Sequence, residues 1–379
     1  MKLTISRNEL NEAIQHVSKA VAARTTIPIL SGIKIDADDR GVTLTASDTD
    51  ISIQSFIPKE TTDKTVATIH RGGSVVLPAK FFVEIIRKLP SEEVHMEVGD
   101  RFQTSITSGA IDIQLVGLDP EEFPVLPVLE EDRVFSISGD QLKTMIRQTV
   151  FAVSTNEATP ILTGVLWNLQ DGVFKFVATD RHRLATSSVS CEAAEDLRFS
   201  NVVISGKTLG ELSKIIPDQD VLVDIVVAEN QVLFKLGNVL FYTRMLDGTF
   251  PDTTRIIPTS FRTELVLGTK ALSEAIDRAY LLSREEKTNI VRLTTTDSGG
   301  IEISSSSSEL GRVQEQLAVD ELKGEPVRIA FNSKYMLDVL KVVDSEQMFI
   351  GFTGAMSPII IRPEGDSSLH LILPYRTTN

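Results

Sequence analysis

Several short groups of residues carry side chains that could do chemistry, but none completes a catalytic motif. Ser205-Gly206-Lys207-Thr208 has the form of the end of a phosphate-binding loop, yet Asn201 stands where such a loop needs its first glycine. Asp48-Thr49-Asp50 offers two carboxylates without a third ligand in a defined place. Asp180-Arg181-His182-Arg183 could supply an acid–base pair, but no nucleophile accompanies it.

Metal chemistry finds equally little support. His16, His70, His95 and His370 are scattered, and the single cysteine, Cys191, cannot form a zinc site with them at any recognised spacing. We therefore predict that the protein is not an enzyme and that it needs no metal and no cofactor. One cysteine also fits a reducing cytoplasm. Arg7, Glu9 and Glu12 interrupt the place where a secretory signal needs an apolar run, and we expect no membrane span.

An internal repeat organises the chain. Pro28, Leu30 and Gly32 recur at one fixed interval as Pro160, Leu162 and Gly164, and Ala46-Ser47-Asp48 returns at that interval as Ala178-Thr179-Asp180. A second set recurs three times at equal spacing. It comprises a lysine, an acid and a base, at Lys80, Glu84 and Arg87, then Lys207, Glu211 and Lys214, then Lys334, Asp338 and Lys341. A pattern that recurs three times at a fixed interval indicates three copies of one domain.

Each copy is predicted to hold two amphipathic helices among β-strands. The helices are expected at 7–24 and 78–89, 138–154 and 205–216, and 268–284 and 332–342. Strand-like alternation appears at 42–45, 173–177 and 300–304, between turns rich in Asp and Gly. Proline-bearing stretches close the first two copies. We therefore predict an α+β protein with domains at 1–128, 129–258 and 259–379.

Charge is divided between the helices and the rest of the chain. The net charge is −14, which by itself disfavours a nucleic-acid binder. Yet Lys and Arg outnumber Asp and Glu in each of the six helix ranges, so the remaining residues are more acidic than the whole. An ordinary solvated helix face explains one such stripe, but six basic helices on an acidic body favour a protein that attracts phosphates on one side only. Three similar domains in series also form a heterologous arrangement that either closes into a ring or continues as a helix.

The segments Pro-Ile-Leu-Ser-Gly, Ala-Thr-Asp-Arg-His-Arg-Leu, Leu-Asp-Gly-Thr-Phe-Pro-Asp and Leu-Ile-Leu-Pro-Tyr-Arg occur in an order and spacing that resemble the bacterial sliding clamps, the beta subunits of DNA polymerase III. The resemblance covers essentially the whole chain. It implies three tandem clamp-type domains, each with two helices on antiparallel sheets, that form half of a closed ring. It further implies a head-to-tail homodimer that encircles duplex DNA and binds it without sequence specificity, as a processivity factor.

The resemblance also implies roles for particular residues. DNA contacts fall on Arg24 at the end of the first helix, on Asn156 in a loop, and on Lys80, Lys207 and Lys334. A groove for partner peptides is lined by Leu162, Thr179, His182, Arg183, Leu184, Pro251, Ile256, Met356, Pro358, Leu371, Leu373, Pro374, Tyr375 and Arg376. There, aliphatic side chains would take Leu or Phe anchors, while Arg183 and Arg376 would hold peptide carbonyls or a carboxylate. The leucines could equally belong to the strand core.

For the dimer contact, the resemblance places Ile111 and Ile113 of one chain against Leu281 and Leu282 of the other, although all four could instead belong to their own domain cores. The expected partners are duplex DNA, the polymerase III catalytic subunit, the clamp loader, and other polymerases and repair proteins with short peptide motifs. The expected location is the bacterial cytoplasm, at the nucleoid. The alternative is a repeat scaffold that recruits peptides but never binds DNA, which would have no need of basic helices.

Overall fold

A computed structural model describes residues 1–22, 24–126, 129, 133–194, 197–285, 289–307 and 309–376. Contacts divide the chain into two compact units, Met1–Asp140 with Glu211–Met245, and Gln141–Gly210 with Leu246–Asn379. The second copy of the sequence repeat therefore contributes to both units. Val128, at the first predicted domain boundary, lies outside the described residues. No helix in the described ranges is long and apolar enough to cross a membrane.

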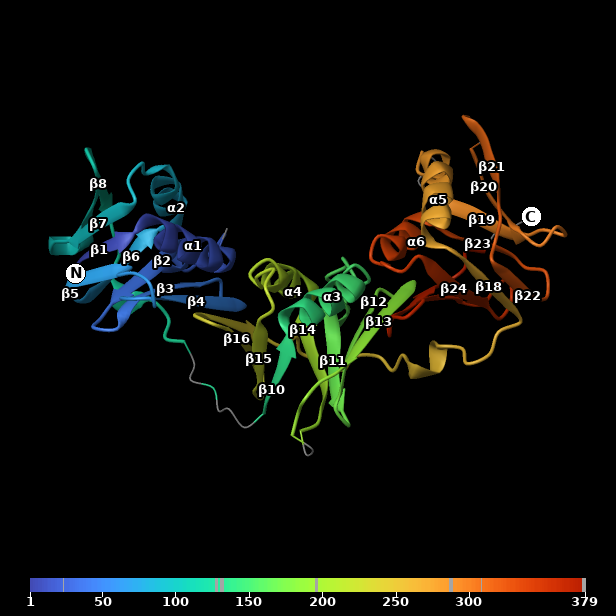
Figure 1. Ribbon diagram of the computed structural model, residues 1–379, viewed down its shortest axis with the longest axis horizontal. Helices are drawn as coiled ribbons and strands as arrows, with labels where there is room; N and C mark the ends of the chain where they lie inside the picture. Colours follow the sequence, from blue (N-terminus) through green and yellow to red (C-terminus); the bar gives the residue numbers. More distant parts are fainter. Residues whose placement is uncertain are drawn as a thin grey trace. The chain divides into compact units, whose positions relative to one another are not determined.

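The first unit contains two antiparallel sheets (Figure 1). The five-stranded sheet has the order β5 (Ala67–Arg71), β1 (Lys2–Ser6), β7 (Glu93–Val98), β8 (Gln103–Ser108) and β9 (Ile111–Val116). The eight-stranded sheet has the order β10 (Val134–Ser138), β15 (Leu222–Val227), β16 (Gln231–Leu236), β17 (Val239–Arg244), β4 (Ile51–Pro58), β3 (Gly41–Ser47), β2 (Gly32–Ala37) and β6 (Gly73–Pro78). Helices α1 (Arg7–Val17) and α2 (Ala79–Lys88) lie side by side and bury Ile14 and Phe82.

The second unit contains the other two sheets. The nine-stranded sheet has the order β14 (Phe199–Ser205), β11 (Gly164–Gln170), β12 (Val173–Thr179), β13 (Arg183–Ser190), β26 (Leu369–Ile372), β25 (Ile359–Pro363), β24 (Gln347–Phe352), β18 (Thr263–Gly268) and β22 (Glu321–Gly324). The four-stranded sheet has the order β21 (Gly311–Leu317), β20 (Ile301–Ser307), β19 (Ile290–Thr295) and β23 (Arg328–Asn332). Helices α5 (Thr269–Ser283) and α6 (Ser333–Leu340) lie side by side and share one buried core with both sheets (Figure 1). Helices α3 (Gly139–Val150) and α4 (Gly206–Ser213) complete the six that the sequence predicts.

The order of elements is more regular than the sequence repeat revealed. A strand, a helix and three strands follow one another six times in the described chain, beginning at β1, β6, β10, β14, β18 and β23, with β5 and β22 as additions. Each copy of the sequence repeat therefore consists of two β-α-β-β-β half-copies. Sequence alone missed this smaller unit because the two halves of one copy share a pattern of elements and not of residues.

The first helix ends earlier than its amphipathic pattern predicts. α1 stops at Val17, and a 3₁₀ turn, η1 (Ser18–Ala20), follows it. The backbone N–H of Ala22 then donates to the carbonyl of Leu30. Ala22 also packs against a buried cluster that contains Leu30 and Phe123. Tertiary packing therefore takes the chain off its helical path, and Arg24 lies exposed in the following loop instead of at the end of a helix.

Candidate functional site

The predicted groove residues gather around three neighbouring strands of the second unit. β13 pairs with β26, which pairs with β25, so that Leu184 lies beside Leu371 and Leu371 beside Ile360. With Leu162 and Phe250 these side chains belong to one buried cluster. Leu162, on the 3₁₀ turn η5 (Pro160–Thr163), and the strand residues Leu184 and Leu371 are therefore core residues, the simpler of the two roles considered for them, and we call them the apolar floor.

Exposed apolar side chains lie within a few residues of this buried cluster in the sequence. Ile256 ends the 3₁₀ turn η6 (Thr254–Ile256), Met356 lies in the turn before β25, and Leu373 and Tyr375 follow β26. Their exposed fractions are 46%, 56%, 37% and 49%, respectively. The segment after β26 is fixed by its backbone, because the N–H of Leu373 donates to the carbonyl of His182 and that of Tyr375 to the carbonyl of Ala330. Large apolar side chains held on ordered backbone are typical of a surface that binds a partner.

Arg183 does not offer a free guanidinium. Its Nε donates to Asp180 Oδ2 at 2.9 Å and its Nη1 to Asp338 Oδ2 at 2.7 Å, with only 11% of the side chain exposed. The guanidinium also lies over the rings of Tyr335, at 4.5 Å, and Phe151, at 5.4 Å. The structure therefore gives Arg183 a positioning role, joining β13 to α6. Arg376, the other arginine expected to hold peptide carbonyls or a carboxylate, is exposed.

The turn between β12 and β13 is built from the same short motif. Thr179 Oγ1 donates to the carbonyl of Arg183, and Asp180 Oδ1 accepts the N–H groups of His182 and Arg183. Arg181 has a φ of 76°, which this network holds in place. His182 is exposed and stacks on Tyr335, at 6.4 Å between ring centroids. Pro251 is exposed, and Pro358 and Pro374 are half-buried, next to the apolar residues described above.

The three repeated lysines occupy equivalent places. Lys80, Lys207 and Lys334 are each the second residue of their helix, and all three are exposed. The first turn of a helix disfavours a cation by about 0.3–1 kcal/mol, because the unpaired N–H groups there carry a partial positive charge. The acid that follows is occupied elsewhere, since Glu84 pairs with Arg87 and Glu211 with Lys214. Within the described ranges no ion pair to any of the three lysines is found. Asn156 is also exposed, in the loop after α3.

The four predicted dimer residues lie at two sheet edges. Ile111 and Ile113 are on β9, the outermost strand of the five-stranded sheet. Leu281 and Leu282 are near the end of α5, which packs on β20 and β21, and β21 is the outermost strand of the four-stranded sheet. Ile111 is 36% and Leu281 50% exposed. The sequence did not reveal β21, because Val313 and Leu317 are the only large apolar residues in it and none of its residues is fully buried.

The groups considered for catalysis have structural roles. Asp48 Oδ1 accepts the N–H groups of Asp50 and Ile51 in a turn where Thr49 has a φ of 82°. His370 is fully buried between strands. In the part of the chain that the structure describes, no three His, Cys, Asp or Glu side chains come together as a metal site.

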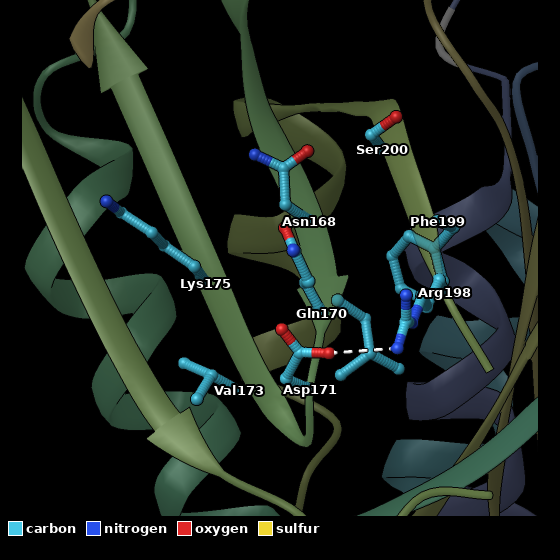
Figure 2. Close-up of a pocket in the computed structure, with 9 residues that line it drawn as sticks. Asn168, Gln170, Asp171, Val173, Lys175, Arg198, Phe199 and Ser200 are labelled. Atoms are coloured by element: carbon cyan, nitrogen blue, oxygen red, sulfur yellow. Dashed lines mark ion pairs between the residues drawn. The ribbon is translucent and has the colours of Figure 1, made fainter. Parts of the chain in front are cut away.

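A hollow of about 650 Å³ lies over β14, β11 and β12 (Figure 2). It forms where the pairing of β11 with β14 shifts register between Trp167 and Leu169, next to Asn201 with its φ of 59°. Arg198 and Asp171 pair across it at 3.1 Å, as Figure 2 shows. Its lining contains none of the residues predicted for the peptide groove.

Comparison with known proteins connects these features to one family. Family models of the DNA polymerase III beta subunit match the chain in order, the N-terminal domain at residues 1–127, the central domain at 136–252 and the C-terminal domain at 254–376. The beta sliding clamps of Bacillus subtilis and Halalkalibacterium halodurans are each 52% identical to the chain and match over 100% of both lengths. The crystal structure of the DNA polymerase sliding clamp from Bacillus subtilis superimposes with a TM-score of 0.97, at 51% identity and full coverage of both chains.

The fold and the comparisons define a three-domain protein of the clamp type. The chain belongs to the DNA polymerase III beta subunit family. Its function is that of a sliding clamp, a processivity factor in DNA replication, and the fold expected from the sequence is confirmed.

Proposed function

We propose that two copies of this chain close head to tail into a ring that encircles duplex DNA. The use of terminal strands carries this proposal. Four of the six last strands of the β-α-β-β-β half-copies meet a half-copy from another copy of the sequence repeat: β4 pairs with β17, and β13 pairs with β26. The two remaining last strands, β9 and β21, are sheet edges within the chain. Pairing β9 of each copy with β21 of the other would use all the last strands, and an arrangement of this kind closes.

The side chains at these edges suit such a contact. Along β9, Ile111 and Ile113 alternate with polar residues. They remain partly exposed, because within the described residues no further strand pairs with the outer edge of β9. Val313 and Leu317 on β21 are partly buried against the core of the second unit, and Leu281 on α5, the helix that packs on β21, is half exposed. A second copy would cover the apolar side chains that remain partly exposed at both edges. It would also provide hydrogen-bond partners for the free backbone groups of the two edge strands.

The test is the oligomeric state of Ile113→Lys, measured by analytical ultracentrifugation at micromolar concentration. We expect a monomer that keeps its circular dichroism spectrum, because the lysine would be buried without a partner in the dimer and solvated in the monomer. Val173→Lys, at an exposed valine on β12, serves as the control and should remain dimeric. An Ile113→Lys protein that dimerises as tightly as the parent would exclude this interface.

We further propose that Lys80, Lys207 and Lys334, with Arg24 and Asn156, contact the DNA backbone. The support is that one unfavourable placement, a cation in the first turn of a helix, occurs three times without a compensating ion pair within the described residues. Phosphates would supply the missing partner. Such contacts carry no base specificity, so the clamp can slide while the closed ring prevents dissociation.

The corresponding measurement compares retention on nicked circular plasmid with retention on the same plasmid linearised, after loading with a clamp loader and ATP. Protein that stays on the circle through gel filtration at high salt, and leaves the linear form, is held topologically, because salt screens simple phosphate contacts. Equal loss from both forms would favour the alternative, a scaffold that binds peptides and no DNA. The triple variant Lys80→Ala, Lys207→Ala and Lys334→Ala should load poorly and still dimerise, whereas Lys323→Ala on β22 should load normally.

We propose that the groove over β13, β26 and β25 takes short peptide motifs of the polymerase catalytic subunit, the clamp loader and repair proteins. Exposed Met356, Leu373 and Tyr375 would hold aliphatic or aromatic anchors above the buried leucine floor. Anchor contacts of this type typically contribute about 2 kcal/mol or more. Tyr375→Ala should therefore weaken a fluorescent polymerase-derived peptide by about thirtyfold in an anisotropy titration. Val173→Ala is the control, and unchanged affinity in Tyr375→Ala would place the peptide elsewhere.

The remaining predictions belong to the same proposal. We infer that the clamp acts without catalysis, in the bacterial cytoplasm at the nucleoid, and that its domains divide at 128/129 and 258/259. The support for the absence of catalysis is that the Asp48 and Asp180 carboxylates hold turns together, which leaves them no substrate-binding geometry. Hydrolysis of ATP in the loading assay is expected from the loader alone.

A further inference from the structure

Two histidines on different strands converge on one hydroxyl group in the five-stranded sheet. Thr4 Oγ1 on β1 lies 2.8 Å from His95 Nδ1 on β7 and 3.4 Å from His70 Nε2 on β5. Both histidines are exposed, and they line a hollow of about 410 Å³ together with Thr4, Glu97 and Thr107. Neither the clamp function nor the proposed DNA, peptide and dimer contacts use this cluster.

Strand pairing places the two rings on one face of the sheet. On one side of β1, Thr4 lies directly opposite His95. On the other side Thr4 lies directly opposite Thr68, and His70, two residues further along β5, shares the face of Thr68 because side chains alternate along a strand. His70 therefore reaches the same hydroxyl that His95 reaches from the other neighbouring strand.

Charged groups of both signs lie around the pair, with the Met1 amino group among the cations near Glu97. Glu97 on β7 forms ion pairs with Lys2 Nζ at 3.1 Å and with Arg71 Nη2 at 3.8 Å. Glu93, two residues before His95, is exposed on the same strand. On the far side β8 contributes only the hydroxyls of Ser105 and Thr107 to the hollow. Two imidazoles that converge on a hollow open to solvent, with the Glu97 carboxylate on its lining, are a suitable environment for a divalent cation.

We propose that His70 Nε2 and His95 Nδ1 together bind a borderline divalent transition-metal ion, with Zn²⁺ as the representative. Imidazole nitrogen selects Zn²⁺, Ni²⁺ and Cu²⁺ over Mg²⁺ and Ca²⁺, which prefer oxygen. Zn–N bonds are about 2.0–2.1 Å long, and both nitrogens already point at one common atom. A small rotation of each exposed ring places an ion between them beside Thr4. Water fills the remaining positions, because the described residues hold no group of three such ligands.

Binding at this place would join β5 to β7 across β1. These are three of the five strands in the sheet whose outer edge is β9. An ion that binds only the folded sheet stabilises it by mass action. The site would therefore make the stability of this sheet depend on zinc, without any part in catalysis.

The test is isothermal titration calorimetry of ZnCl₂ into the full chain, purified without a polyhistidine tag and in a buffer that does not chelate metals. We expect one saturable site per chain that weakens at least about tenfold in His70→Gln and in His95→Gln, a loss of about 1.4 kcal/mol each. Thr4→Val is the matched control. It keeps both imidazoles and removes only the hydroxyl, so zinc binding should persist.

A second readout separates binding from a change in folding. Zinc should raise the melting temperature of the parent and of Thr4→Val, and should leave that of His95→Gln unchanged. Saturable binding that survives both histidine substitutions would overturn the proposal. So would the absence of binding by the parent at about 1 mM ZnCl₂, where even a weak site of about 4 kcal/mol is half filled. A loss of zinc binding in Thr4→Val would also overturn it, because the imidazole pair would then not be enough to bind the ion.

Discussion

His370 gives the folded protein a defined sensitivity to acid. Its ring lies on β26 with no exposed surface, and neither ring nitrogen has a hydrogen-bond partner among the described residues. Phe151 packs beside it at 5.7 Å between ring centroids. Burial lowers its pKa from 6.5 to about 4, and the nearby Asp366 carboxylate offsets this only in part. The imidazole is therefore neutral at neutral pH, as its surroundings require.

The sign of the pH effect follows from this lowered pKa. As the pH falls below 6.5, the unfolded chain binds a proton at His370 and the folded chain does not, so the free energy of unfolding decreases. The decrease continues until the pH reaches the folded pKa of about 4, and stops below it. One pKa unit corresponds to about 1.4 kcal/mol, which gives about 1.4 kcal/mol at pH 5.5 and about 3 kcal/mol at most.

The assay is urea unfolding of the parent and of His370→Leu at about pH 7.5 and pH 5.5, followed by the fluorescence of Trp167. Trp167 is the only tryptophan, is fully buried, and lies in the same unit as His370. His370→Leu should gain about 1.4 kcal/mol relative to the parent on acidification. Leu369→Ala, also on β26, should lower stability by a similar amount at both pH values. Parallel pH dependences of the parent and His370→Leu would refute the assignment of this proton to His370.

Two further substitutions test the packing of the second unit, each against a matched control. Arg183→Met leaves Asp180 and Asp338 unpaired at side-chain exposures of 12% and 20%, and should cost about 3–5 kcal/mol in the Trp167 assay. Arg147→Met, whose partner Asp344 is 72% exposed, should cost at most about 1 kcal/mol, and equal losses would contradict the buried network. Gly324→Ala would place a Cβ 1.8 Å from the carbonyl of Arg262 at a φ of +97°, and should lower the thermal midpoint far more than Gly299→Ala, where φ is +83° and the space is open. Similar midpoints would mean that β22 can move away from β18.

The sequence predicted the elements and their order better than their ends and partners. Apolar periodicity located all six helices, because each buries one face against a sheet. It failed at residues 18–24, where the amide of Ala22 bonds to Leu30, a partner that only the folded structure supplies. Arg24 was consequently assigned to a helix end that does not exist.

The site shows the same division between what is local and what is not. The turn at Asp180 and its pairing with Arg183 are local, but the second partner of Arg183, Asp338, lies far away in the sequence. From the sequence, Leu162, Leu184 and Leu371 could belong either to the buried core or to a surface that binds a partner. That distinction depends on β13 meeting β26, and residue patterns do not encode which strands meet. The histidine cluster at Thr4 escaped notice for a related reason, since it depends on β1 lying between β5 and β7.

The repeated acid of the second helices shows how equivalent positions acquire different roles. Glu84 and Glu211 pair within their own helices, with Arg87 and Lys214, and such exposed pairs contribute only a few tenths of a kcal/mol. In the third copy the acid is Asp338, one methylene shorter, and it pairs instead with Arg183 of the second copy. Both partners there are largely shielded from solvent, so removing either leaves a buried charge. The acid at this position forms only an exposed pair with a nearby base in two copies, whereas in the third copy it joins two domains. The repeat determines the position of the carboxylate. In the third copy, the shorter side chain and the nearby buried arginine determine its ion-pair partner.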